Sequence, residues 1–120
     1  METTWDDSYR EDCPARLVLG MVGDKWTLLT ISALGDGAVR FADLRRRLAG
    51  ISQKVLTATL RAMERDGLVD RTVHPTTPPS VEYALTELGR GVRVPLEALQ
   101  VWAEHNTAAV EAARTRFDSR

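Results

Sequence analysis

The fold of this chain is decided by residues 41–67, FADLRRRLAGISQKVLTATLRAMERDG. In its first part Phe41, Leu44 and Leu48 recur at spacings of three and four residues, which predicts a short amphipathic helix. The tripeptide around Gly50 then interrupts the helical pattern and predicts a tight turn.

A second helix is expected directly after this turn. Ser52 is a good N-cap, because its side-chain oxygen can accept a hydrogen bond from a free backbone N–H of the first turn. Apolar residues follow at helical spacing and form the expected buried stripe: Leu56, Leu60 and Met63. Gly67 is a suitable stop just beyond the helix. Two short helices joined by a glycine-containing turn predict a helix-turn-helix over about residues 41–66.

The outward face of the second helix is polar and basic. Gln53 begins it, and four further residues share one face at spacings of three and four: Lys54, Thr57, Arg61 and Arg65. The N-terminal part of a recognition helix normally points into the major groove, so Gln53, Lys54 and Thr57 are candidates for base contacts. Arg61 and Arg65 lie further along and are expected at the DNA backbone. A surface helix without a DNA role shows similar residues, so this stripe alone leaves both interpretations open.

Beyond Gly67 the apolar pattern changes to that of β-strands. Two β-prone runs, at 68–73 and 81–85, flank the polar and proline-rich segment 74–80. This predicts a β-hairpin, a wing at about 68–85, whose prolines stiffen the tip and remove N–H donors that would pair with another strand. Three polar residues of the tip are further candidates for DNA contact: His74, Thr76 and Thr77.

Helices are expected on both sides of the motif. Pro14 opens an apolar segment, and residues 25–34 are apolar nearly all round, which describes a buried helix. Thr86 caps a long C-terminal helix at about 86–117, which Pro95 should kink or divide. The expected fold class is α+β, mainly α: a winged helix-turn-helix with flanking N- and C-terminal dimerisation helices.

Composition limits what this domain can be. A chain of 120 residues with 43% hydrophobic and 28% charged residues is typical of one globular domain, here at 13–120 behind a flexible acidic arm at 1–12. There is no apolar run of about 18 residues, which predicts no membrane span, and no signal-peptide pattern at the N-terminus. With a single cysteine, a cytoplasmic location is expected.

The formal net charge of −1 hides an uneven distribution. Residues 1–12 hold five acids and one base, whereas residues 40–71 hold eight bases and four acids. Phosphate binding depends on the local field, so Arg40 and Arg46 join the candidates for DNA contact. A solvated charged face is the competing interpretation of the same charges.

Several blocks of this sequence resemble the HxlR-type winged-helix regulators of bacteria. The resemblance runs from Cys13 to about Trp102, in matching order and spacing. Its blocks are Cys13-Pro14, GDKWTLL at 23–29, RFADLRRRL at 40–48, GISQKVLT at 50–57, LR at 60–61, DGLVDR at 66–71, PPSVEY at 78–83 and LTELG at 85–89.

This resemblance implies a winged helix that dimerises through its N- and C-terminal helices. It also implies that the recognition helix starts at Ser52, so that Ser52 lies at the DNA beside Gln53, Lys54 and Thr57. Ala42 departs from the family pattern, which often has serine there, and this departure predicts a weaker start to the first motif helix. The tail after Trp102 is longer than the family leads one to expect.

A dimer is also expected from the residues themselves. The C-terminal helix carries more apolar surface than a small core can cover, and a second copy of the chain would cover it. The expected interface residues are Trp5, Leu17, Leu96, Leu99, Trp102 and Val110. The competing interpretation is a long helix that folds back on its own domain.

Cys13 is a candidate for redox sensing. The resemblance implies that some family members use a cysteine here as a thiol switch for oxidants or electrophiles. A helix N-terminus and Arg16 favour the thiolate, whereas Glu11 and Asp12 disfavour it. The competing interpretation is a partly buried cysteine that packs near the dimer interface and senses nothing.

The expected function is that of a sequence-specific transcriptional regulator of double-stranded DNA, a dimeric repressor at a pseudo-palindromic operator. An enzyme is disfavoured, because His74 and His105 lack partners at metal-ligand spacing and 23–27 lacks the spacing of a phosphate loop. No cofactor, metal or membrane partner is expected. Two further functions stay open: a winged helix used for protein contact, and a MarR-like regulator with a small-molecule inducer.

Overall fold

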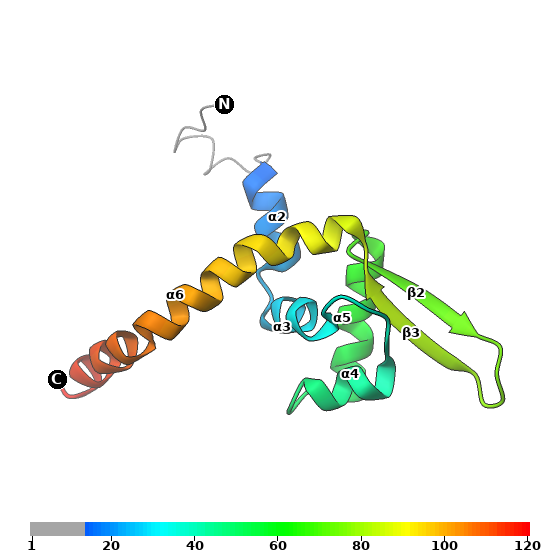
Figure 1. Ribbon diagram of the computed structural model, residues 1–120. Helices are drawn as coiled ribbons and strands as arrows, with labels where there is room; N and C mark the ends of the chain where they lie inside the picture. Colours follow the sequence, from blue (N-terminus) through cyan, green and yellow to red (C-terminus); the bar gives the residue numbers. More distant parts are fainter. Residues whose placement is uncertain (1–13) are drawn as a thin grey trace.

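The computed structural model describes residues 14–120. Figure 1 shows a small helical body, from which a β-hairpin projects on one side and a long C-terminal helix on the other. The elements in chain order are α2 (Pro14–Val22), α3 (Lys25–Leu34), β1 (Val39–Arg40), α4 (Phe41–Arg47), α5 (Gln53–Arg65), β2 (Val69–His74), β3 (Ser80–Leu85) and α6 (Glu87–Asp118). This mainly helical arrangement with a small sheet is the expected winged helix-turn-helix.

The sheet is antiparallel, with β3 between β1 and β2. The hairpin pairs Val69 with Leu85 at its base and His74 with Ser80 at its outer end. On the other edge of β3, Val39 pairs with Tyr83. The pattern of the sequence did not predict β1, because a strand of two residues is too short to show alternation.

The core lies where α3, α4 and α5 meet the sheet. The predicted stripe of α5 is confirmed: Leu56, Leu60 and Met63 are at most 1% exposed. They belong to one buried cluster with residues of α3, α4, the sheet, α6 and the segments between them, namely Ile31, Leu34, Val39, Leu44, Leu48, Ile51, Leu68, Val69, Leu85 and Leu96. The prediction that residues 25–34 are buried all round was wrong. Only one face of α3 packs into the core, and Leu29 on the other face is 44% exposed.

The end of α5 is joined tightly to the start of α6. Gly67 adopts a φ of +78°, a left-handed conformation that favours glycine. Its N–H bonds to the carbonyl of Glu64, and the N–H of Leu68 bonds to that of Met63, which is the Schellman ending of a helix. Thr86 then caps α6: its hydroxyl accepts from Gly89 N–H and donates to the Gly67 carbonyl.

Pro95 does not divide the C-terminal helix, contrary to expectation. α6 runs as one helix from Glu87 to Asp118 with the proline inside it, as Figure 1 shows. The proline deprives only the Gly91 carbonyl of a helical partner. Both residues are exposed, so water can hydrogen-bond to that carbonyl.

The first half of α6 is fixed to α3. Arg93 contacts Asp36 just after α3, with Nη1 and Oδ1 2.5 Å apart, and also donates to the Gly35 carbonyl. The hydrogen bond and charge of Arg93 hold the pKa of the Asp36 carboxyl below its ordinary value. Further along, Gln100 donates to the Ser32 hydroxyl at 3.2 Å. The residues of α6 after Gln100 are exposed or half-buried, so this part of the helix does not fold back onto the body.

Between residues 14 and 120, no single helix is long and apolar enough to cross a membrane. The pair α2 and α3 satisfies the length and composition together, but the two helices are bent by 75° relative to each other.

The contact between α6 and the end of α5 yields a stability prediction. A Cβ at Gly89 would lie 2.2 Å from the Leu68 carbonyl oxygen, which is backbone and cannot swing away. We expect Gly89→Ala to lower the free energy of unfolding by about 1–3 kcal/mol in urea denaturation.

The matched control is Gly91→Ala, two residues along the same helix, where a Cβ meets nothing within 4 Å. It should raise the free energy of unfolding by roughly 0.5–1 kcal/mol, because alanine favours the helix. Equal effects of the two substitutions would contradict the close packing at Gly89.

Candidate nucleic-acid interface

The recognition helix expected from the sequence is α5, and its start is capped as predicted. The Ser52 hydroxyl accepts a hydrogen bond from the N–H of Val55 at 3.1 Å. Since Leu56, Leu60 and Met63 face the core, the opposite side is open to solvent. All the predicted contact residues of this helix are exposed there: Gln53, Lys54, Thr57, Arg61 and Arg65.

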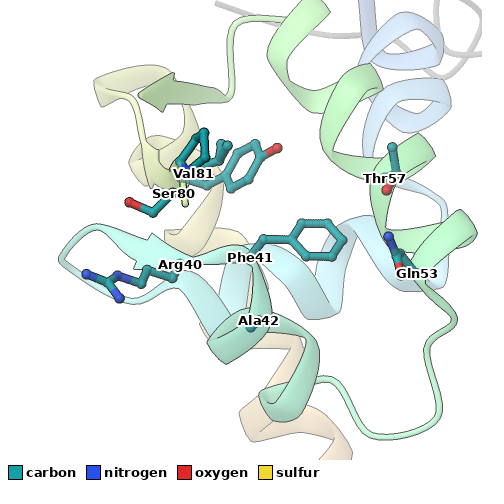
Figure 2. A pocket seen from close by; sticks show the side chains of 9 residues that line it. Arg40, Phe41, Ala42, Gln53, Thr57, Ser80 and Val81 are labelled. Carbon is teal, nitrogen blue, oxygen red and sulfur yellow. The ribbon is translucent and has the colours of Figure 1, made fainter. Parts of the chain in front are cut away.

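A hollow of about 480 Å³ separates α5 from the wing. Figure 2 shows Gln53 and Thr57 pointing from α5 toward this hollow, while Phe41 reaches toward them from the start of α4. Arg40 stands at the outer edge, with its guanidinium directed away from α5. The wing lines the other side of the hollow with Pro79, just before β3, and with three residues of β3: Ser80, Val81 and Tyr83.

The basic residues of α4 differ in what they contact. Arg45 donates to the Ile51 carbonyl across the turn, and Arg47 donates to the Ala33 carbonyl at 2.8 Å, so both hold α4 in place. Arg46 is paired with Asp43 one turn earlier on the exposed side. Arg45 and Arg47 keep their charges, because a carbonyl is neutral, whereas the charge of Arg46 is partly balanced by the Asp43 carboxylate.

The start of α4 has no side-chain cap. Arg40 occupies the N-cap position of α4, and its side chain makes no capping hydrogen bond. The preceding residues are held instead by the sheet, where Arg40 pairs with Glu82 of β3. Strand pairing thus fixes the start of this helix in the absence of a side-chain cap.

The wing residues expected at DNA lie in different settings. His74, at the end of β2, is half-buried with Nε2 3.2 Å from Glu82 Oε2. The Thr76 hydroxyl donates to the Pro78 carbonyl and helps shape the tip. Thr77 is exposed at the tip itself. Of these three, His74 is turned toward a carboxylate of its own hairpin.

The residues expected at the dimer interface differ in their exposure to solvent. Leu17, Leu99 and Trp102 are 58–69% exposed, and Val110 is half-buried. Leu96 is instead 8% exposed and belongs to the core of its own chain, because the anchored part of α6 presses it against the body. Trp5, like Cys13, lies outside the described residues.

Four residues at the interface were not singled out by the sequence. Phe41 was assigned to the core, and Val81 and Tyr83 were expected only as strand residues, yet all three line the hollow beside α5. Arg71 was counted only as part of a basic region. Its Nε lies 3.4 Å from Glu64 Oε1, which connects β2 to α5. The hairpin places Arg71 opposite Tyr83, whereas Phe41 comes beside β3 through the pairing of β1, which left no signal in the sequence.

The fold and this surface define a winged helix-turn-helix DNA-binding protein. Among residues 14–120, no three histidine, cysteine or acidic side chains gather into a group that could hold a metal ion. The HxlR-like helix-turn-helix family matches residues 21–111, and the chain belongs to this family of transcriptional regulators. This membership confirms the expected resemblance and excludes an enzyme.

Individual relatives agree with the family. The chain is 44% identical over 106 residues to the HTH-type transcriptional regulator YtfH of Escherichia coli K12, covering 88% of this chain and 84% of that protein. The structure of the regulator ytfH from Salmonella typhimurium superposes with a TM-score of 0.79 at 43% identity, covering 95% of this chain and 99% of the other. The redox regulator HypR in its reduced form gives 0.77 at 37% identity, with coverages of 82% and 98%.

The cap of α5 can be tested by its effect on stability. Ser52→Ala leaves the Val55 N–H without its partner, and we expect the free energy of unfolding to fall by about 1 kcal/mol. Ser52→Asp keeps a side-chain acceptor at the N-cap and should unfold within a few tenths of a kcal/mol of the wild type. Equal losses in the two variants would show that the hydroxyl does not act as a cap.

Proposed function

We propose that this protein is a sequence-specific regulator that binds duplex DNA as a homodimer and acts as a repressor at a pseudo-palindromic operator. The observation that carries the proposal is the exposed polar face at the start of α5, beside the hollow against the wing. Its amide, ammonium and hydroxyl groups can read base edges in the major groove. Repression is favoured because a bound dimer occludes a promoter, and the protein would work in the cytoplasm, where its DNA lies.

Within α5 we assign different roles to the two ends of the polar face. Ser52, Gln53, Lys54 and Thr57 lie at the N-terminal end and would contact bases. Arg61 and Arg65 lie one and two turns further on and would contact phosphates, as would Arg40 and Arg46 at the edge of the motif. In the wing, Thr76 and Thr77 would reach the adjacent backbone or minor groove, with His74 behind them.

These roles predict different phenotypes for two single substitutions. Lys54→Ala should change the preferred sequence in a genome-wide binding assay with purified protein and weaken the best sites by roughly 1–3 kcal/mol. Arg61→Ala should weaken binding uniformly across sequences. It should also make the salt dependence of the binding constant shallower, by the amount expected for the loss of about one phosphate contact.

Arg114→Ala is the matched control, since Arg114 is exposed on the far part of α6. It should bind with the preference and salt slope of the wild type. If the wild type binds no duplex DNA at low salt, the proposed function is wrong.

The proposed dimer rests on an apolar surface that the described part of this chain leaves uncovered. None of the residues of α2 is buried, and Leu17 and Leu19 are more than 60% exposed. On α6, Val94, Leu99 and Trp102 are 58–71% exposed. The radius of gyration is 17.5 Å, well above the roughly 14 Å of a compact domain of this length. A second copy, packing α2 and α6 against their counterparts, would cover this surface and place two recognition helices about 34 Å apart.

The dimer predicts a change of oligomeric state when charge is placed on α6. Trp102→Glu should shift the protein to monomer in sedimentation equilibrium at micromolar concentration, with unchanged helix content because Trp102 lies outside the core. Val73→Glu is the control, because Val73 is 51% exposed but lies on the wing. A wild-type monomer under these conditions would refute the dimer.

Sensing by this regulator stays a prediction. HypR is named a redox regulator, which is compatible with the expectation for Cys13. That residue lies outside the described part of the chain, so its surroundings carry no argument. A small-molecule or electrophile inducer is likewise expected without an assigned site.

A further inference from the structure

A second hollow adjoins the one in Figure 2. It has a volume of about 360 Å³ and is lined by Thr57, Arg61 and Glu64 of α5 and by Arg71 and Tyr83 of the wing. Thr57 and Tyr83 line both hollows. The two hollows therefore adjoin on the wing side of α5, and we call them together the wing groove.

The chemistry along the wing groove alternates. Arg40 stands at one end, and Arg61 and Arg71 lie at the other. Between them the lining is largely apolar and includes Phe41 and Val81, with Thr57 and Tyr83 as its hydroxyl-bearing residues. Positive groups separated by apolar surface and hydroxyl donors match a sugar–phosphate chain, whose charged phosphates are separated by weakly polar sugars.

The position of the wing groove selects one part of the DNA. When α5 lies in the major groove and the wing flanks the neighbouring minor groove, one backbone strand separates the two grooves. That strand must run between α5 and the wing, which is where the wing groove lies.

Tyr83 is held as a hydrogen-bond donor in this groove. Its ring packs against Phe41 with the ring centres 6.5 Å apart. Burial raises the pKa of its hydroxyl, and the nearby Arg71 only partly opposes this. A tyrosine hydroxyl is protonated at neutral pH even at its ordinary pKa. A protonated phenol can donate to a phosphate oxygen.

We propose that the wing groove holds the backbone of one DNA strand, with Arg71 and the Tyr83 hydroxyl contacting a phosphate beside Arg61. This inference rests on the proposed DNA-binding function and adds to it a phosphate site formed jointly by the recognition helix and the wing. Glu64, which also lines the wing groove, offers a direct test of this phosphate site. Its carboxylate lies 3.4 Å from Arg71 and would repel the phosphate while partly neutralising the guanidinium.

The experiment measures binding to a mixed-sequence duplex of about 40 base pairs across salt concentrations, since phosphate contacts set the salt slope. Arg71→Gln should weaken binding roughly fivefold to tenfold. It should also reduce the slope of the logarithm of the binding constant against the logarithm of salt concentration by about one. Tyr83→Phe keeps the ring and should weaken binding roughly tenfold through the lost hydroxyl. Glu64→Gln should strengthen binding, because it removes the negative charge and frees Arg71.

A purely structural ion pair gives the opposite pattern. Glu64→Gln and Arg71→Gln would then both lower the melting temperature, and neither would change the salt slope relative to the Arg114→Gln control. If the wild type binds DNA, either that pattern or weaker DNA binding by the Glu64→Gln variant would overturn the proposed phosphate site. Absence of DNA binding by the wild type overturns the proposed function itself, so the two failures are distinguishable.

Discussion

The arrangement of this protein depends on the place where α5 ends and α6 begins. Gly67 turns the chain out of α5, Thr86 caps α6 while its hydroxyl donates to the Gly67 carbonyl, and Gly89 lies against the Leu68 carbonyl. This contact fixes the direction of the long helix relative to the recognition helix. In a dimer, the same contact would set the spacing of the two recognition helices, because α6 would carry most of the interface.

The electrostatics of the surface are decided by pairing rather than by the number of basic residues. The region between residues 40 and 71 carries twice as many bases as acids, but Arg45 and Arg47 are used on backbone carbonyls within the motif. Arg46 and Arg71 each have a carboxylate partner. The field over the proposed interface depends on the local distribution of charge, so the near-zero total charge is no obstacle to DNA binding.

The candidate site could be predicted from the sequence only in part. The features that depend on residues close together in the chain were predictable, and those that depend on distant residues were not. Ser52, its helix and the exposed residues of α5 were predictable, because caps and helical stripes depend on residues within one or two turns. The hollow beside the wing was not. It depends on β1, which pairs residue 39 with residue 83 and has no periodic signal of its own. Of the expectation that Pro95 kinks or divides α6, the division was wrong, because the local rule ignored that the Gly91 carbonyl, which loses its partner, is exposed to solvent.

The sequence by itself determined the family, the order of the elements and the exposed polar face of α5, since each is encoded by residues near one another in the chain. Tertiary structure alone decided which apolar residues of α6 are covered. Leu96 belongs to the core because Arg93 and Gln100 fasten its turn of helix to α3, whereas Leu99 and Trp102 stay exposed. It also decided that Tyr83 and Arg71 meet α5. Such contacts join segments distant in sequence, and only the packing of the whole chain sets their geometry.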